Sequence, residues 1–233
     1  MDHSLIIDEH LTRQIDLISR ESLNSNPVTV IGCGAIGSFA ALALAKMGLT
    51  RMTLYDMDKV DIVNMNAQFF PYQSIGSNKA RATAHLLKEF ANCEVIAHER
   101  AFTRDDVMHL SHIVVVAVDS MEVRGMVFDE IKKSGFNVKL IIDPRMSAES
   151  YAQYAINPFD TRDCATYDKT LYTDGESVQE RCTAKSTIYT AMLSAGYIAK
   201  TAKQFISGQK YTRCLQWDIR LNVRQMTEQE SQG

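Results

Sequence analysis

The chain has 233 residues, of which 45% are hydrophobic and 23% are charged, and its formal net charge is −3. These values are typical of a folded protein with one sizeable domain, and they give no general attraction to nucleic acid or to anionic membranes. The longest apolar helical run, residues 39–44, is too short to span a bilayer, and no apolar signal segment opens the chain.

The cysteines point to a reducing compartment. They are five in number, widely spaced and without a C-x-x-C pair: Cys33, Cys93, Cys164, Cys182 and Cys214. Such a set argues against a disulfide framework and against a four-cysteine zinc site. We therefore expect a cytoplasmic protein with no membrane partner and no structural zinc.

The chain divides into three parts. Residues 1–26 are polar and predict an N-terminal helix and linker arm, with the break at residues 21–26. Residues 27–224 predict a single domain, and residues 225–233 a polar tail. Within the domain, strands and helices alternate, which is typical of a parallel sheet.

The expected elements are as follows, in chain order. Strands are expected at 28–31, 51–55, 94–97, 112–118 and 139–142, and helices between them at 35–47, 79–91 and 121–133. Gly48 is expected to end the first helix and Ser77 to cap the second. The strand at 139–142 is expected to end at Asp143 and Pro144.

The pattern changes after residue 144. A surface-facing strand is expected at 151–156, then an aperiodic polar stretch at 158–179, a long helix at 183–206 and a strand at 215–223. A long loop of this kind inside a compact domain is usually functional or disordered. The whole pattern predicts an α/β fold: a Rossmann-like, mostly parallel sheet with helices on both faces and an antiparallel C-terminal extension.

The most informative stretch is a glycine turn between the first strand and the first helix, VTVIGCGAIG at residues 28–37. Gly32 allows a tight turn, Gly34 lets the backbone approach a phosphate closely, and Gly37 lets helix and strand pack together. Free N–H groups at the helix start, at Ala35 and Ile36, favour an anion. The stretch predicts an adenine-nucleotide site.

Polar residues follow several of the predicted strands. In open parallel sheets ligands bind beyond the carboxyl ends of the strands, where the sequence places Asp56, Asp58, Asn64, Asn66 and Asp119. Asp56 is suited to accept hydrogen bonds from ribose hydroxyls. Lys79, at a helix start, could reach phosphates, and Asp119 could hold Mg²⁺, which prefers carboxylate and phosphate oxygens.

Five short segments together resemble one family, the ThiF/MoeB/HesA adenylyltransferases, which are relatives of ubiquitin-activating enzymes. The segments are DMDKVDIVN at 56–64, IGSNKA at 75–80, VDSMEVR at 118–124, TRQI at 12–15 and RM at 145–146. They are similar to the family patterns D-x-D-x-V-x-x-x-N, G-x-x-K-A/V, D-N/S-x-x-x-R, R-Q-I and R-M-x-G. A dehydrogenase has no reason to share this set.

The resemblance implies ATP-dependent adenylation of a carboxylate, often the C-terminal glycine of a ubiquitin-like or sulfur-carrier protein, with release of pyrophosphate. It also implies a homodimer. By position, Asp56 and Asn64 would hold the ribose side and Asp119 the metal. Lys79 and Arg13 of a partner subunit would serve the phosphates. Gln68 falls in the same nucleotide-binding segment.

Two positions qualify this implication. Where the family has N-L-x-R-Q, this chain has Ala67 in place of the arginine. Loss of one charge-stabilising group can raise a barrier by roughly 3 kcal/mol. Either Arg81 or Arg145 substitutes for it, or adenylation is lost. Cys182 precedes the long helix, where relatives often have a cysteine for acyl or persulfide transfer; it is equally consistent with an ordinary, partly buried cysteine.

Simpler interpretations stay open. Asp119 could cap a strand end, Lys79 could be a solvated helix lysine, and Arg13 could form only a surface ion pair. At the level of function, three alternatives to protein activation remain. They are a relative of the cyclodehydratases that activate a tRNA base carboxylate, a catalytically impaired scaffold for a partner that binds nucleotide or nothing, and an NAD-dependent oxidoreductase. The charge argues weakly against nucleic acid.

Overall fold

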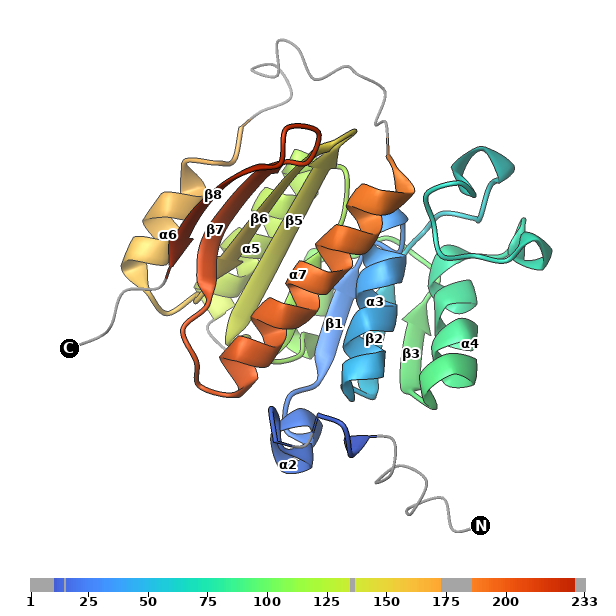
Figure 1. The fold of residues 1–233 in the computed structure, drawn as a ribbon, viewed down its shortest axis with the longest axis horizontal. Helices are drawn as coiled ribbons and strands as arrows, with labels where there is room; N and C mark the ends of the chain where they lie inside the picture. Colours follow the sequence, from blue (N-terminus) through green and yellow to red (C-terminus); the bar gives the residue numbers. More distant parts are fainter. Residues whose placement is uncertain (1–10, 15, 135–136, 173–185, 229–233) are drawn as a thin grey trace.

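The computed structural model describes residues 11–14, 16–134, 137–172 and 186–228. They form one eight-stranded sheet in the order β3-β2-β1-β4-β5-β6-β7-β8, flanked by helices (Figure 1). The first five strands of that order pair in parallel, and β6, β7 and β8 continue the sheet with antiparallel pairs. The predicted fold class is confirmed.

The strands are β1 (Val28–Ile31), β2 (Arg51–Tyr55), β3 (Glu94–His98), β4 (Ile113–Val116), β5 (Leu140–Ser147), β6 (Ser150–Ile156), β7 (Thr212–Asp218) and β8 (Val223–Glu228). The α-helices are α2 (Arg20–Asn24), α3 (Ala35–Met47), α4 (Lys79–Ala91), α5 (Met121–Ser134), α6 (Thr161–Asp168) and α7 (Ile188–Ile206). Short 3-10 turns are η1 (Ile62–Asn64), η2 (Tyr72–Ser74) and η3 (Arg104–His109).

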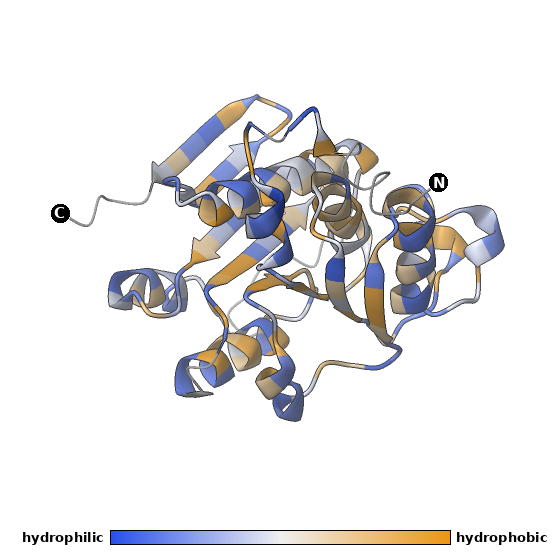
Figure 2. Cartoon of the chain, turned by 90° about the horizontal axis from the view of Figure 1, so that it is seen from below, coloured by the Kyte–Doolittle hydropathy of each residue, from blue (hydrophilic) through white to orange (hydrophobic). Residues whose placement is uncertain are grey.

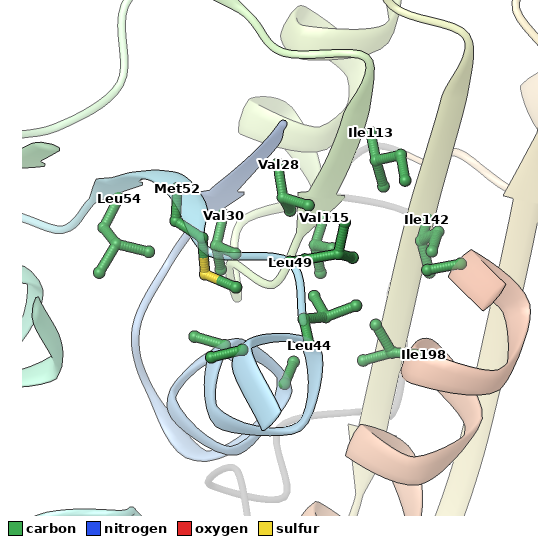
Figure 3. Packing of buried hydrophobic residues seen from close by; sticks show 14 of the residues in the cluster. Val28, Val30, Leu44, Leu49, Met52, Leu54, Ile113, Val115, Ile142 and Ile198 are labelled. Carbon is green, nitrogen blue, oxygen red and sulfur yellow. The ribbon is translucent and has the colours of Figure 1, made fainter. Parts of the chain in front are cut away.

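Helices cover both faces of the sheet because side chains alternate along each strand. On β4, Ile113 and Val115 join the core beneath α3 and α7, whereas Val114 and Val116 join the core beneath α5. All four residues are buried, as expected for a central parallel strand. Figure 3 shows the first of these cores, and Figure 2 shows apolar residues concentrated in the middle of the molecule.

The helix expected at residues 35–47 is confirmed, and its end fixes the N-terminal arm. Gly48 closes α3 in the left-handed conformation, with φ 109°. Leu11 and Leu23 lie close to Gly48, and Gln14 donates a hydrogen bond to the carbonyl of Met47. The arm therefore docks at the end of α3 that is opposite the glycine turn (Figure 1).

Two predicted boundaries at the N-terminal half were wrong. Helix α2 occupies most of the expected break at 21–26, because Ser19 caps it and Leu23 anchors it in the core. The cap of α4 is Asn78 and not Ser77: the Asn78 side chain accepts hydrogen bonds from the backbone N–H groups of Ala80 and Arg81. Asparagine and serine are both good caps, so the sequence alone did not choose between them.

Strand β5 does not end at Asp143 and Pro144 but runs on to Ser147. Its ladder with β4 stops at Ile142, and beyond that point it pairs only with β6. Pro144 thus lies where one side of the strand is free, a position that tolerates proline. Ala148, which aligns with the glycine of the R-M-x-G pattern, follows the strand with φ 51°, a conformation that favours glycine.

The C-terminal elements differ more from the prediction. The stretch expected to be aperiodic contains α6, an eight-residue helix whose buried residues are Asp163 and Tyr167. The long helix begins at Ile188 and not at residue 183. The single strand expected at 215–223 is two strands, β7 and β8, and β8 includes residues assigned to the tail. Residues 223–227 are all exposed at the sheet edge, so no apolar alternation marks them.

Across the part of the chain that the structure describes, none of the helices combines the length and apolar character that crossing a bilayer requires.

Candidate nucleotide site

The glycine turn lies where the strand order reverses, between the carboxyl ends of β1 and β4, which is where open parallel sheets bind ligands. Gly32 has φ 91°, and a Cβ there would lie 2.5 Å from the carbonyl oxygen of Ala117. A Cβ on Gly37 would lie 1.8 Å from the Gly32 oxygen. Both glycines are therefore required for packing, independently of any ligand.

Gly34 is different, because a Cβ there would meet no atom within 4 Å. It is the N-cap of α3 and supplies no side chain to the first turn. The first N–H groups of a helix have no partner within the helix. Next to an open backbone at Gly34, the N–H groups of Ala35 and Ile36 provide a cradle that fits a phosphate.

Asp56 connects the glycine turn to the next loop. Its Oδ2 accepts a hydrogen bond from the backbone N–H of Cys33 (2.6 Å), and its Oδ1 accepts one from Asp58 (2.8 Å). Burial raises the pKa of the Asp56 carboxyl, and the two N–H donors oppose that rise. Each oxygen keeps lone-pair capacity, so Asp56 both holds the turn and could accept ribose hydroxyls.

Lys79 lies against this loop. Its backbone N–H donates to the carbonyl of Asp58 (2.8 Å) and its Nζ donates to Asp58 Oδ2 (2.9 Å). The lysine side chain is 9% exposed and that of Asp58 is 57% exposed. We call Cys33, Asp56, Asp58 and Lys79 the Lys79 network, since hydrogen bonds connect them continuously from the glycine turn to the start of α4.

The segment after β2 folds back over the first turn of α3. The backbone N–H of Phe69 donates to Ser38 Oγ (3.1 Å), which places Gln68 beside the glycine turn. Gln68 Oε1 is buried and has no hydrogen-bond partner, so it is an acceptor available to a ligand. Asn64 lies in η1 on the same segment. Ala67, in place of the family's arginine, is fully buried.

Asp119 lies next to the glycine turn. The Cβ position of Gly32 lies 3.2 Å from the backbone nitrogen of Val118, directly before Asp119. Asp119 is exposed at the carboxyl end of β4. Arg124 holds the backbone that leads to Asp119 in place by donating to the carbonyls of Val116 (3.0 Å) and Val118.

A second charged cluster, centred on Asp143, was not predicted from the sequence. Asp143 is fully buried and ion-paired with Arg124, and its Oδ2 accepts hydrogen bonds from Arg145 (2.7 Å) and Tyr167 (2.7 Å). Burial lowers the pKa of Arg124 to about 10 and raises that of Tyr167, so both stay protonated at neutral pH. We call these four residues the Asp143 cluster.

The Asp143 cluster bears on the missing arginine. Arg145 was one of two candidates to replace it, but its guanidinium is bonded to Asp143 and to both the carbonyl and the hydroxyl of Thr170. The other candidate, Arg81, is exposed and lies 3.5 Å from Glu99. Of the two, only Arg81 has a side chain loosely enough held to be redirected toward a ligand.

The predicted site residues thus fall into three groups. The structure brings together Gly32, Gly34, Ala35, Ile36, Gly37, Asp56, Asp58, Gln68, Lys79 and Asp119, with Asn64 on the adjoining segment. Arg13 is exposed in the arm at the far end of α3, about 20 Å away for a helix of 13 residues. Cys182 lies outside the described residues.

Among the described residues, no group of three or more His, Cys, Asp or Glu side chains could hold a metal ion. Asp119, the one metal ligand that the sequence predicts, would contribute one carboxylate to a cation. Mg²⁺ is commonly bound in this way, by one or two carboxylates together with substrate phosphates. The donor set fits Mg²⁺ held jointly with a nucleotide.

The sheet order and the glycine turn at the switch point define an α/β protein of the Rossmann-like class. A family comparison is more specific: the ThiF family matches residues 8–232. The chain therefore belongs to the ThiF family, as its sequence motifs predict.

Individual relatives match over shorter stretches. The chain is 34% identical over 95 residues to ubiquitin-like modifier-activating enzyme 5 of Rattus norvegicus, covering 40% of this chain and 23% of that protein. It is 39% identical over 87 residues to tRNA threonylcarbamoyladenosine dehydratase of Bacillus subtilis (strain 168), covering 36% of this chain and 34% of that protein. These matches thus span about a quarter to a third of the relatives' lengths.

Among solved structures, E. coli MccB with ATP superposes with a TM-score of 0.74 and 15% identity, covering 96% of this chain and 69% of MccB. At that identity the likeness shows a common fold.

Proposed function

We propose that the protein is an ATP-dependent adenylyltransferase that activates a carboxylate. The observation that carries this proposal is the convergence of three features at one end of the sheet. These are the open cradle at Gly34, the Lys79 ammonium joined to the turn through Asp56 and Asp58, and Asp119 beside Gly32.

The comparisons support the same chemistry. Membership of the ThiF family, the resemblance to a ubiquitin-like modifier-activating enzyme and the fold shared with MccB, solved with ATP, all favour adenylation. On this basis the carboxylate is the C-terminus of a protein or peptide, and a ubiquitin-like or sulfur-carrier protein ending in glycine is the first candidate.

In the proposed reaction a carboxylate oxygen attacks the α-phosphorus of ATP. A new P–O bond forms, the bond to the β-phosphate oxygen breaks, and pyrophosphate leaves with that electron pair. The α3 N-terminus and Lys79 stabilise the charge on the phosphates, Asp56 orients the ribose, and Gln68 Oε1 accepts from the nucleotide or the substrate. Mg²⁺, when bound at Asp119, would neutralise phosphate charge.

Arg13 fits this scheme only from another subunit. Its position at the far end of α3 prevents it from reaching the glycine turn of its own chain. We therefore propose a homodimer in which each Arg13 serves the phosphates bound by its partner. Cys182 is a candidate acceptor of the acyl group in a later step.

The test is ATP–pyrophosphate exchange by the full chain, with a panel of ubiquitin-like proteins ending in Gly-Gly and short peptides with free carboxyl ends. We expect exchange with at least one substrate, and loss of exchange in Asp119→Ala. Unchanged exchange in Asp119→Ala would disprove the metal assignment. Tight ATP binding without exchange on any carboxylate would contradict the adenylation proposal.

Two observations favour other candidates. The 39% identity to a tRNA threonylcarbamoyladenosine dehydratase favours a carboxylate on a tRNA base, which would appear as salt-sensitive tRNA binding. Burial of Ala67 at the family's arginine position favours a scaffold that binds ATP without reacting it. The exchange experiment separates this scaffold from an enzyme.

A further inference from the structure

Lys79 lies at a position where a helix does not favour a lysine. It is the first residue of α4, and the positive end of the helix dipole disfavours a cation there. Its side chain is 9% exposed, so solvent screens this effect poorly. A partner group must offset both the unfavourable helix dipole and the burial of the ammonium for Lys79 to stay in place.

Asp58 provides that offset. It accepts hydrogen bonds from Lys79 twice, through its carbonyl from the backbone N–H (2.8 Å) and through its carboxylate from Nζ (2.9 Å). The backbone bond fixes the start of the lysine side chain and the ion pair fixes its end. A flexible four-carbon chain with both ends fixed has little freedom left.

Asp58 is itself fixed relative to the glycine turn. Its backbone N–H donates to Asp56 Oδ1, while Asp56 Oδ2 accepts from the backbone N–H of Cys33. Asn78, the cap of α4, donates to the carbonyl of Asp56 (2.8 Å) and so ties the helix start to the same loop. The ammonium of Lys79 thereby has a defined position relative to the phosphate cradle.

The geometry also leaves donors free. An ammonium has three N–H donors, and the described residues supply only Asp58 as a hydrogen-bond acceptor for Nζ. Two donors remain for phosphate oxygens while the contact with Asp58 persists. The Asp58 carboxylate, in contrast, is paired with a cation, and its negative charge would repel a phosphate at close range.

We propose that Asp58 is a positioning residue that aims the Lys79 ammonium at the phosphates, and that it does not itself bind the nucleotide. This inference rests on the proposed adenylation. It revises the expectation from the sequence, which places Asp58 among the nucleotide-binding residues beyond the carboxyl ends of the strands.

Positioning has a characteristic kinetic effect. In Asp58→Asn, the loss of a nearby negative charge favours phosphate binding. The loss of a fixed position for the Lys79 ammonium disfavours it. The two effects therefore oppose each other in the ground state. The exchange rate depends more strongly on the position of the Lys79 ammonium, because charge stabilisation in the transition state needs accurate placement of that group. We therefore expect kcat for exchange to fall about tenfold while the Kd for ATP changes less than about threefold.

The control is Asp61→Asn. Asp61 is an exposed carboxylate on the same segment that accepts only a local bond from the N–H of Val63 (3.1 Å). We expect its kinetics to match those of the unaltered protein. A second control uses the background Lys79→Met, in which Asp58→Asn should have no further effect on kcat.

The decisive experiment combines exchange kinetics, calorimetric binding of ATP and adenosine, and the rate at which formaldehyde and cyanoborohydride methylate Lys79, read by peptide mass spectrometry. In Asp58→Asn we expect the kcat loss, unchanged adenosine affinity and faster methylation of Lys79 than in Asp61→Asn. A tenfold kcat loss that persists in the Lys79→Met background, or weakened adenosine binding, would overturn the proposal, because Asp58 would then contact the nucleotide.

The methylation measurement needs no nucleotide or carboxylate. If no substrate supports exchange, the proposed function fails on its own, and equal methylation of Lys79 in Asp58→Asn and Asp61→Asn would then overturn the positioning role separately.

Discussion

The Lys79 network and the Asp143 cluster both lie near the carboxyl ends of the parallel strands, and both pair carboxylates with cations. They differ in solvent exposure and in how fully their groups are bonded. Asp143 is completely buried and is contacted by Arg124, Arg145 and Tyr167. In the Lys79 network the Asp58 side chain is 57% exposed, and Nζ has one bonded acceptor among the described residues.

This difference separates a structural cluster from a proposed binding site. A buried carboxylate surrounded by donors cannot exchange partners without exposing an uncompensated charge, so the Asp143 cluster holds β4, β5, α5 and α6 together. In the Lys79–Asp58 pair the lysine is buried but the carboxylate is exposed, so Asp58 stays hydrated if the ammonium also binds an anion. Substitutions in the Asp143 cluster and in the Lys79 network test this contrast.

The largest effect is expected for Arg124→Met. It removes the partner of the buried Asp143 Oδ1 and the donor to the carbonyls of Val116 and Val118. We expect the free energy of unfolding in urea to fall by about 3 kcal/mol or more, the range for breaking a buried pair.

Arg104→Met is the matched control. Arg104 is an exposed arginine 3.9 Å from Glu130, and its loss should change stability by less than about 0.5 kcal/mol. Equal effects of the two substitutions would mean that the Asp143 cluster does not stabilise the sheet.

A smaller effect is expected for Tyr167→Phe. The substitution removes one hydrogen bond to Asp143 Oδ2 but keeps the ring against Phe128. We expect a loss of about 1–2 kcal/mol in thermal or urea unfolding. Tyr189 is the control: it is exposed and donates to the carboxylate of Glu149. Tyr189→Phe should lower the free energy of unfolding by less than about 0.5 kcal/mol. A larger loss for Tyr189→Phe than for Tyr167→Phe would contradict the contrast between the two regions.

The smallest effect on stability is expected for Lys79→Met. Asp58 would lose its partner but stay hydrated, so the free energy of unfolding should change by less than about 1 kcal/mol. A loss as large as that of Arg124→Met, measured in the same urea titrations, would show that Lys79 is structural and would remove the basis for treating it as a site residue.

The sequence predicted the Lys79 network far better than the Asp143 cluster. The glycine turn, Asp56 and Asp119 follow strands with clear apolar runs, and the topology of a parallel sheet brings strand ends together. Lys79 was singled out by its motif at the start of a helix. The Asp143 cluster depends on Tyr167, which lies in a helix with only two buried residues, and on a strand that continues through Pro144. Neither feature produces a periodic pattern.

Local competition between equivalent residues explains the remaining differences. Asn78 and Ser77 are adjacent and both able to cap α4, and only the bond from Asn78 to the Asp56 carbonyl shows why the asparagine is used. The edge strand β8 buries neither face, so its residues were indistinguishable from a polar tail. The distance of Arg13 from the glycine turn likewise follows only from the position of the docked arm in the structure.

The central claim, that the Lys79 ammonium binds phosphates, is tested most directly by calorimetric titration of ATP with Mg²⁺ into the unaltered protein and Lys79→Met. We predict binding to the unaltered protein and at least about tenfold weaker binding to Lys79→Met, because a charge-assisted hydrogen bond contributes about 1.5–3 kcal/mol. Arg104→Met should bind as the unaltered protein does. Equal affinity of the unaltered protein and Lys79→Met, or no binding of ATP by the unaltered protein, would contradict the claim.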